Sequence, residues 1–408
     1  MARVVIAGGG PAGIMAAVRS AYLGNNVTLI EKNASLGKKL LLSGKGRCNL
    51  TNTCGLDDFL RRFSASGNFL RDAFKLFFNK ELTSFFEKRG VKLKAERQGR
   101  VFPVSDSSVT ILNALKKELT ASNVRVIFGA RLIGVDVENF SVKSALLSNK
   151  GRLAAEKIIL ACGGAAYPFT GSDGNGYDIA KELGHTITDI KPGLVPLKVK
   201  QKHLASRLKG LTLKNIQLKF SSGRKKVKSD IGELLFTDSG ISGPLVLTLS
   251  GRLLDILKAR KGLIVEIDLK PALSREMLDV RLQREFNLSP KRSLGNMLKA
   301  MLPHKLISVF LDTAGIDKDK KVAHVTRRER AAIETLLKSM RLEITGSLGM
   351  DKAMITRGGI SLKEIDPRTM ASKLIKGLYF AGEIMDIDAD TGGFNLQAAF
   401  STGYVAGS

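Results

Sequence analysis

The alternation of apolar and polar stretches near the N-terminus predicts a strand, a helix and a second strand. Apolar residues form a short continuous run typical of a buried strand, then recur at the spacing of one helical face, then form a second run. We expect these elements at 3–7, 11–24 and 27–30. Strand, helix and strand in this order form the first half of a dinucleotide-binding unit.

The same patterns continue along the chain. Apolar runs predict strands at 124–128, 134–137, 157–161 and 377–381, with helices within 68–89, at 177–183 and from about 391 onward. Between 194 and 269 the pattern changes to short alternating strands, expected at 194–199, 211–220, 233–236, 245–249 and 263–269. Such a series indicates an inserted small barrel or sandwich.

These elements predict an α/β fold with a Rossmann-like domain that the inserted segments interrupt. We expect a split cofactor domain at 1–190 plus 341–408, a basic β-barrel at 191–273 and a helical subdomain at 274–340. A chain of 408 residues is long enough to bury several cores.

The first turn carries the candidate cofactor chemistry. Gly8 allows a tight turn, Gly10 lets the backbone approach a pyrophosphate, and Gly13 lets the helix pack closely on the sheet. The start of the helix supplies N–H groups to the phosphates, and Glu31 stands where a carboxylate accepts hydrogen bonds from an adenosine ribose. The expected contacts in this segment are Gly8, Gly10, Pro11, Ala12, Gly13, Glu31 and Lys32.

Glycines also follow other predicted elements. Gly44 and Gly46 lie in a loop with Lys45 and Arg47 that can offer backbone N–H groups and a guanidinium to a ligand. Gly163 and Gly164 follow a strand, and the segment 391–397 opens a helix of small residues. A reduced flavin concentrates negative charge at its N1 and O2 edge, which suits such a helix start. Two helix N-termini, one near each end of the chain, can therefore hold one FAD.

The charge of the chain is unusually positive, with 65 Lys and Arg against 38 Asp and Glu, a net +27. Between Lys191 and Ser229 there are twelve basic residues and no acidic one. This run is typical of a surface that binds a polyanion, although a lysine-rich proteome or an ordinary solvated surface would explain it too. The expected RNA contacts are Lys202, Arg207, Lys209, Lys214, Arg224, Lys225, Lys226 and Lys228.

Other classes of protein are disfavoured. Three cysteines without a CxxC pair and four scattered histidines argue against a disulfide framework and a metal site. The apolar stretch from Val4 to Val18 contains glycines and a proline, and no signal peptide precedes it. We expect a cytoplasmic protein without a metal.

Three strings carry a resemblance to a known family: SGKGRCNLTN at 43–52, GELLFTDSGISGP at 232–244 and GLYFAGEIMDIDADTGGFNLQAAFSTGYVAG at 377–407. They closely resemble the BaiN and YhiN type of FAD-dependent oxidoreductases, over essentially the whole chain. The resemblance implies a split FAD domain of the two-dinucleotide-binding-fold class, an inserted β-barrel and a helical subdomain. One departure is Cys162, where the family pattern more often has threonine.

The resemblance also implies roles for individual residues. Gly8, Gly10, Gly13 and Glu31 match the FAD fingerprint of the family. Gly382 and Glu383 match its second FAD loop, and Gly392, Gly393, Asn395 and Leu396 match its turn at the flavin edge.

The activities proposed within this family are reduction of steroid enones, oxidation of small amines, and reduction of uridine to dihydrouridine in large-subunit ribosomal RNA. The C5=C6 bond of uracil beside its C4=O group is itself an enone, so both reductions add a hydride and then a proton. The basic segment favours RNA, which would bind through its phosphates. The leading hypothesis is a ribosomal RNA dihydrouridine synthase. The alternative is a small-molecule flavin reductase or oxidase with incidental charge.

Two further expectations concern the reaction. NADH or NADPH is expected to bind transiently as electron donor, because no second dinucleotide fingerprint follows a strand. The candidate catalytic residues are Arg47, Cys48 and Asn49, with Cys48 as proton donor because nearby positive charge makes a thiol more acidic. The alternative is that Cys48 only packs beside the flavin, while Arg47 contacts flavin or phosphate.

Overall fold

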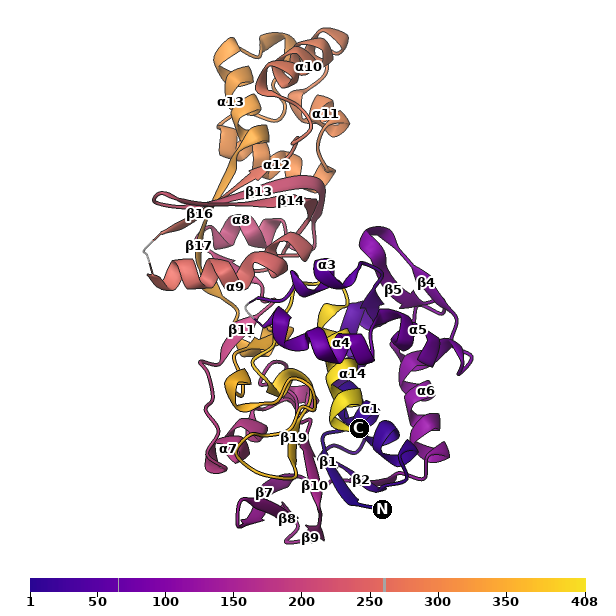
Figure 1. The fold of residues 1–408 in the computed structure, drawn as a ribbon. Coiled ribbons are helices and arrows are strands. Elements are labelled where there is room, and N and C mark those ends of the chain that lie inside the picture. Colours follow the sequence, from indigo (N-terminus) through magenta and orange to yellow (C-terminus); the bar gives the residue numbers. More distant parts are fainter. Residues whose placement is uncertain (65, 260–261) are drawn as a thin grey trace. The chain divides into compact units, whose positions relative to one another are not determined.

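The computed structural model describes residues 1–64, 66–259 and 262–408. The chain forms two compact units, one of Met1–Gly193 with Met350–Ser408 and one of Leu194–Gly349 (Figure 1). The expected boundaries at 190/191 and 340/341 thus become 193/194 and 349/350. The second boundary moves because the strand at Met340–Ser347 pairs with strands of the inserted unit.

A five-stranded parallel sheet forms the centre of the first unit. Its order is β19-β10-β1-β2-β6, from β1 (Arg3–Ala7), β2 (Asn26–Glu31), β6 (Arg125–Phe128), β10 (Lys157–Leu160) and β19 (Leu378–Phe380). Because all strands are parallel, their carboxyl ends meet at one edge, where ligands bind in such folds. The glycines that follow β1, β10 and β19 therefore belong to the same edge.

Helices and small sheets surround this sheet. The helices of the unit are α1 (Pro11–Tyr22), α2 (Lys38–Leu42), α3 (Leu56–Leu60), α4 (Arg71–Leu76), α5 (Asn79–Glu87), α6 (Ser108–Ala121), α7 (Asn175–Glu182) and α14 (Phe394–Ala406). The remaining sheets comprise β3 (Thr51–Asn52) with β5 (Arg100–Pro103) and β4 (Leu93–Ala95), β7 (Leu132–Glu138) with β8 (Ser141–Leu147) and β9 (Arg152–Ala154), and β11 (Lys191–Gly193) with β18 (Ile355–Arg357).

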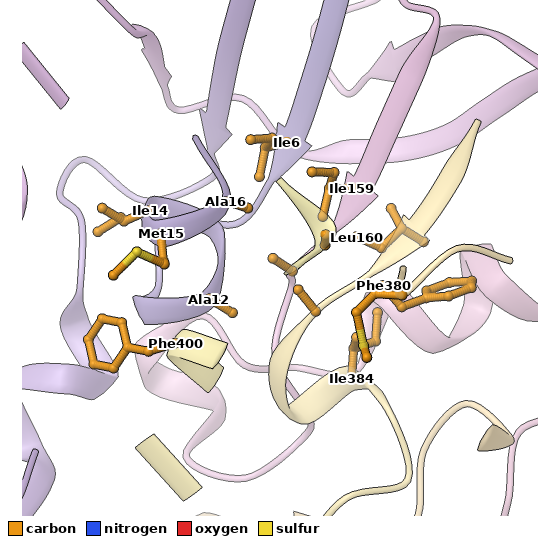
Figure 2. Packing of buried hydrophobic residues seen from close by; sticks show 14 of the residues in the cluster. Ile6, Ala12, Ile14, Met15, Ala16, Ile159, Leu160, Phe380, Ile384 and Phe400 are labelled. Carbon is orange, nitrogen blue, oxygen red and sulfur yellow. The ribbon is translucent and has the colours of Figure 1, made fainter. Parts of the chain in front are cut away.

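The core of the unit lies where α1 and α14 meet the sheet. Figure 2 shows Ile159 and Leu160 of β10 close to the residues of α1, with Phe400 of α14 beside that helix. The two helices pack backbone to backbone, because a Cβ at Gly403 would overlap the carbonyl oxygen of Ala12, and one at Gly407 that of Ala16. The small residues of the last helix therefore let it lie directly against the first.

The second unit is a closed barrel with helices. The strands, in barrel order, are β12 (Leu197–Val199), β15 (Gly240–Ser242), β14 (Lys225–Phe236), β13 (Thr212–Ser222), β16 (Leu263–Asp268) and β17 (Met340–Ser347). The helices are α8 (Lys202–Arg207), α9 (Pro244–Ala259), α10 (Arg275–Leu288), α11 (Leu294–Met297), α12 (His304–Ala314) and α13 (Arg327–Lys338). The predicted barrel is therefore present, and a strand from beyond the helical segment closes it.

One predicted strand is wrong. Residues 245–249 lie in α9, where the buried positions Val246, Leu247, Ser250 and Leu253 recur at helical spacing. A five-residue apolar run does not distinguish a strand from a buried helical segment, and Pro244 at the start of α9 is compatible with a first helical turn.

Candidate cofactor site and basic barrel face

The turn after β1 is built on glycines with two different roles. Gly8 has φ +110°, and a Cβ there would overlap the carbonyl oxygen of Ala161, while a Cβ at Gly13 would overlap that of Gly8. Gly10 differs, because φ is −87° and a Cβ would meet no atom within 4 Å. The fold itself requires Gly8 and Gly13. The missing side chain at Gly10 leaves open space at the start of α1.

The N-terminus of α1 is suited to an anion. Gly10 is its N-cap and Pro11 its first residue, and within the described ranges no side chain caps it. The N–H groups of a first helical turn lack partners inside the helix, and the helix dipole adds partial positive charge there. Ala12 and Gly13, both buried, belong to this turn. Open space and unused donors together fit a pyrophosphate.

Glu31 is held in place at the end of β2. Its side chain is buried, and its carboxylate accepts hydrogen bonds from the Gly9 N–H (2.8 Å), the Asn33 N–H (2.8 Å) and the Asn33 side chain (2.7 Å). A carboxylate has further lone pairs, so it can still accept ribose hydroxyls. Lys32 is not free, since its Nζ lies 2.7 Å from Asp173.

The loop at 43–48 is tightly folded. Gly44, Lys45 and Cys48 all have left-handed backbone angles, with φ of 57°, 59° and 64°, and the Cys48 N–H donates to the Ser43 carbonyl at 3.0 Å. Gly46 is also left-handed, at φ 84°. Left-handed angles in non-glycine residues cost free energy, so tertiary contacts must hold this loop.

Arg47 is engaged by protein groups. Its guanidinium lies 2.8 Å from Glu96 and 3.2 Å from Asp106, and stacks 4.1 Å above the ring of Phe102. Its charge thus faces two carboxylates.

Cys48 is fully buried, and burial raises the pKa of its thiol from 9.0 to about 12, partly offset by a hydrogen bond with Ser43. The expected lowering of this pKa by Arg47 is therefore wrong, because desolvation disfavours the thiolate and the arginine faces carboxylates instead. At neutral pH Cys48 is a packed, protonated thiol.

This burial predicts a pH dependence of stability. The unfolded chain loses the Cys48 proton near pH 9 and the native chain near pH 12, so this thiol's contribution to stability is complete below pH 9 and is lost as pH rises toward 12. Between pH 9 and 11, the free energy of unfolding of Cys48→Ala should fall less steeply than that of the wild type, by about 1 kcal/mol per pH unit. Urea titrations across this range measure the slopes. Cys54→Ala, at a half-buried thiol, is the control, and identical slopes for Cys48→Ala and the wild type would contradict the burial.

A second glycine turn, at the start of α14, is joined to the loop at 43–52. A Cβ at Gly393 would overlap the Thr51 backbone, and the Asn52 side chain donates to the Gly392 carbonyl at 3.2 Å. With its amide oriented to satisfy both partners, Asn49 donates to the Thr51 carbonyl (3.2 Å) and accepts the Gly393 N–H (3.0 Å). Two of the strings that carry the family resemblance thus meet at one helix N-terminus.

Residues inside α14 stabilise the same turn. Asn395 accepts the Ala389 N–H (3.0 Å) and donates to the Ala389 carbonyl (3.0 Å), and Leu396 packs against the core. Thr51 donates to Gln397 at 2.6 Å, and both side chains are fully buried. The sequence analysis missed Thr51 and Gln397, although both lie within the quoted strings.

The loop after β19 connects to the loop after β10. The carboxylate of Glu383 lies 2.7 Å from Lys39 Nζ and accepts the Thr356 N–H at 2.8 Å. The Thr356 hydroxyl in turn accepts the N–H groups of Ala165 (2.8 Å) and Ala166 (3.0 Å). Lys39 and Thr356 were also missed, and the glycine pair after the short strand β18 was the available signal.

Three glycines let these loops approach each other. A Cβ at Gly164 would overlap the Thr356 hydroxyl, and one at Gly163 would lie 2.7 Å from Ser172 Oγ. Gly382 has φ +78°, and its Cβ would lie 2.9 Å from that of Ala12. The loops after β1, β10 and β19 are thus packed against one another at the carboxyl edge of the sheet, around two helix N-termini. This arrangement fits a dinucleotide.

The eight expected RNA contacts all have exposed side chains in the second unit. Lys202 and Arg207 lie in α8, Lys209 follows it, Lys214 lies in β13, Arg224 lies in the hairpin turn, and Lys225, Lys226 and Lys228 lie in β14. Two of them have acidic partners, Arg207 with Asp312 (2.6 Å) and Lys209 with Asp238 (2.7 Å). The other six form no ion pair with any described residue.

The hairpin of β13 and β14 concentrates this charge. Lys228 lies directly opposite Lys219, and Lys219 lies opposite Glu266, which already pairs with Arg341 at 2.8 Å. Like charges placed directly opposite each other destabilise a sheet. We call Lys214, Lys219, Arg224, Lys225, Lys226 and Lys228 the basic hairpin. A cavity of about 350 Å³ lies between this hairpin and α9, lined by Lys225, Lys226, Val227, Arg252, Asp255 and Ile256.

Within the described ranges, no helix combines the length and apolar character needed to cross a membrane, and no three His, Cys, Asp or Glu side chains are grouped to hold a metal ion.

Comparison with known proteins identifies the family. The family model described as HI0933-like protein Rossmann domain matches residues 2–408. A 3-dehydro-bile acid delta(4,6)-reductase of Clostridium scindens is 33% identical, covering 100% of this chain and 98% of its own. A ribosomal RNA dihydrouridine synthase of Haemophilus influenzae is 29% identical, covering 98% of this chain and 96% of its own.

A solved structure supports the fold. The 3-ketosteroid delta1-dehydrogenase from Sterolibacterium denitrificans has a TM-score of 0.54 at 12% identity, covering 100% of this chain and 99% of its own. At this identity the likeness shows the fold alone. The family match and the glycine-lined dinucleotide site agree, and the chain belongs to the HI0933-like Rossmann family of the BaiN and YhiN type, which makes it an FAD-dependent oxidoreductase.

Proposed function

We propose that this protein reduces a conjugated C=C bond, and that its substrate is a uridine of large-subunit ribosomal RNA, which it converts to dihydrouridine. Relatives named for an enone reduction and for dihydrouridine synthesis both cover nearly the whole chain. Both reactions deliver a hydride to the β-carbon of an enone and a proton to its α-carbon.

The described residues suggest how the chain holds its cofactor. The N-terminus of α1, with Gly10 at its cap, would bind the pyrophosphate, and Glu31 would accept hydrogen bonds from the adenosine ribose. The N-terminus of α14 would face the pyrimidine edge of the flavin. Bound FAD, once reduced by NADH or NADPH, would supply the hydride.

The three expected catalytic residues are better suited to building the site. We propose that Asn49 fixes the turn at Gly393, that Arg47 ties the loop to Glu96 and Asp106, and that Cys48 fills space beneath it. The proton for the α-carbon would then come from another side chain or from water.

The basic hairpin is the observation that favours RNA over a small substrate. Lys219 and Lys228 face each other without an acidic partner among the described residues, at a cost to the stability of the sheet. A polyanion would remove this repulsion on binding and release its own counterions. Neither a steroid nor an amine would relieve it.

A small-molecule enone is the second candidate, favoured by the 33% identity to the bile acid reductase. The same hydride and proton transfer would serve it, and the basic hairpin would then have no part in the reaction.

Deleting the gene and measuring dihydrouridine in ribosomal RNA by mass spectrometry tests the proposal. We expect one dihydrouridine to disappear from the large-subunit RNA and to return when the gene is restored on a plasmid. A plasmid carrying Gly13→Ala, which blocks the helix packing described above, should not restore it. Unchanged dihydrouridine after deletion, together with turnover of planar enones by the purified holoenzyme, would favour the second candidate.

A further inference from the structure

Two aromatic side chains project from the turn that follows Gly163 and Gly164. Phe169 is 66% exposed, and Tyr167 is half-buried beside it, with ring centroids 5.5 Å apart and planes inclined at 57°. Most phenylalanines of this unit lie in the core, where exposure to water costs nothing. A large aromatic ring left in solvent at this place calls for a ligand.

The turn that carries the pair is fixed rather than loose. Tyr167 has the left-handed angles φ 55° and ψ 60°, which a bulky side chain rarely adopts. Its carbonyl accepts hydrogen bonds from the Thr170 N–H (2.9 Å) and hydroxyl (2.7 Å), and its own N–H donates to the Met350 carbonyl at 3.4 Å. Strain held by surrounding contacts is found mainly where function needs a set geometry.

The turn is also tied to the proposed cofactor site. The N–H groups of Ala165 and Ala166, directly before Tyr167, donate to Thr356, whose own N–H donates to Glu383. The aromatic pair therefore lies two residues along the chain from a hydrogen-bonded cluster that contains Glu383.

The chemistry around the pair suits a planar ring with carbonyl groups. Burial raises the pKa of the Tyr167 hydroxyl, so it stays protonated and can donate, and no described residue hydrogen-bonds to it. Exposed Lys352 lies in the short helix at Met350–Lys352, which contacts the turn at Pro168–Thr170. An aromatic face, a hydroxyl donor and a nearby ammonium together match a base, its carbonyls and its phosphate.

We propose that Tyr167 and Phe169 form a stacking platform for an unpaired nucleobase of the RNA substrate. The ring of Phe169 would stack on the base, and the Tyr167 hydroxyl would donate to a base carbonyl. This inference rests on the proposed function, since it assumes an RNA substrate. An exposed ring favours a base at the protein surface over a steroid, which needs an enclosed apolar pocket.

The absence of tryptophan from the sequence allows a direct test. Phe169→Trp introduces a single tryptophan at the platform, and Phe140→Trp, at a ring 78% exposed between β7 and β8, is the matched control. A single-stranded uridine-rich oligonucleotide should quench the fluorescence of Phe169→Trp at least about twofold and leave Phe140→Trp nearly unchanged, because stacking requires contact. Both proteins are used as FAD-loaded holoenzymes.

Two variants of the native ring complete the test. Phe169→Ala should weaken oligonucleotide binding about 5- to 100-fold, the loss of one base stack, while Phe140→Ala should not. Tyr167→Phe keeps the ring and should weaken binding less. Equal quenching at both tryptophans, or no quenching in a protein that still restores dihydrouridine to the deletion strain, would overturn the platform and leave the proposed function standing. Quenching by a planar steroid enone but not by RNA would overturn both.

Discussion

Gly10→Ala should bind FAD about 10- to 100-fold more weakly than the wild type while remaining equally stable as the apoprotein. A Cβ at this position meets no protein atom within 4 Å, and φ of −87° is allowed for alanine. The added methyl group would therefore occupy only the space left for the pyrophosphate. Forcing a methyl into close-packed contact costs about 1–3 kcal/mol, which sets the expected loss of affinity.

Two further glycine variants make this test specific. Gly13→Ala should destabilise the apoprotein itself, by several kcal/mol on the order of a severe overpacking, because its Cβ would overlap the Gly8 carbonyl oxygen. Gly55→Ala, at an open position with φ −67° before α3, should change neither property. FAD titration by flavin fluorescence and urea unfolding of the apoprotein measure the two quantities. Wild-type FAD affinity in Gly10→Ala would show that the pyrophosphate does not lie at this helix end.

Lys219→Gln with Lys228→Gln should weaken binding of structured ribosomal RNA about 20-fold near 0.1 M salt. Each lysine that contacts a phosphate contributes about 0.7 to the slope of log affinity against log salt, so the double variant should lower that slope by about 1.4. The loss cannot come from unfolding, because removing two like charges that face each other relieves repulsion in the sheet. Urea unfolding should show equal or greater stability.

Lys116→Gln with Lys117→Gln is the matched control, since both lysines are exposed on α6 and form no ion pair with a described residue. It removes the same net charge from a different surface and should change the salt slope by much less. Equal losses in the two double variants would mean that only the net charge of +27 matters, and that the basic hairpin has no special part in RNA binding.

Local pattern was sufficient wherever one element determines its own conformation. The strand, glycine turn and helix at the N-terminus appear at nearly the expected residues, because helix face, N-cap and buried strand are each encoded within a few positions. Local pattern failed at 245–249, where a short apolar run suits both a strand and the buried face of α9. It also could not show that β17 closes the barrel, since that pairing joins residues far apart in sequence.

The same division holds for the candidate site. The sequence identified the glycines, Glu31 and the two helix N-termini, because backbone conformation and missing side chains are properties of single residues. It did not identify Thr51, Thr356 or Lys39, whose importance comes from partners such as Gln397 and Glu383, hundreds of residues away. It misjudged Cys48, since a neighbouring arginine in sequence says nothing about burial.

The sequence by itself thus determined the cofactor class, the order of the elements and the location of the positive charge, all of which follow from local composition and spacing. Only the tertiary structure decided which basic residues lack acidic partners, which loops meet around the dinucleotide, and that an aromatic pair stands exposed beside Gly163 and Gly164. These properties depend on contacts between distant segments, and desolvation and charge pairing are set by such contacts.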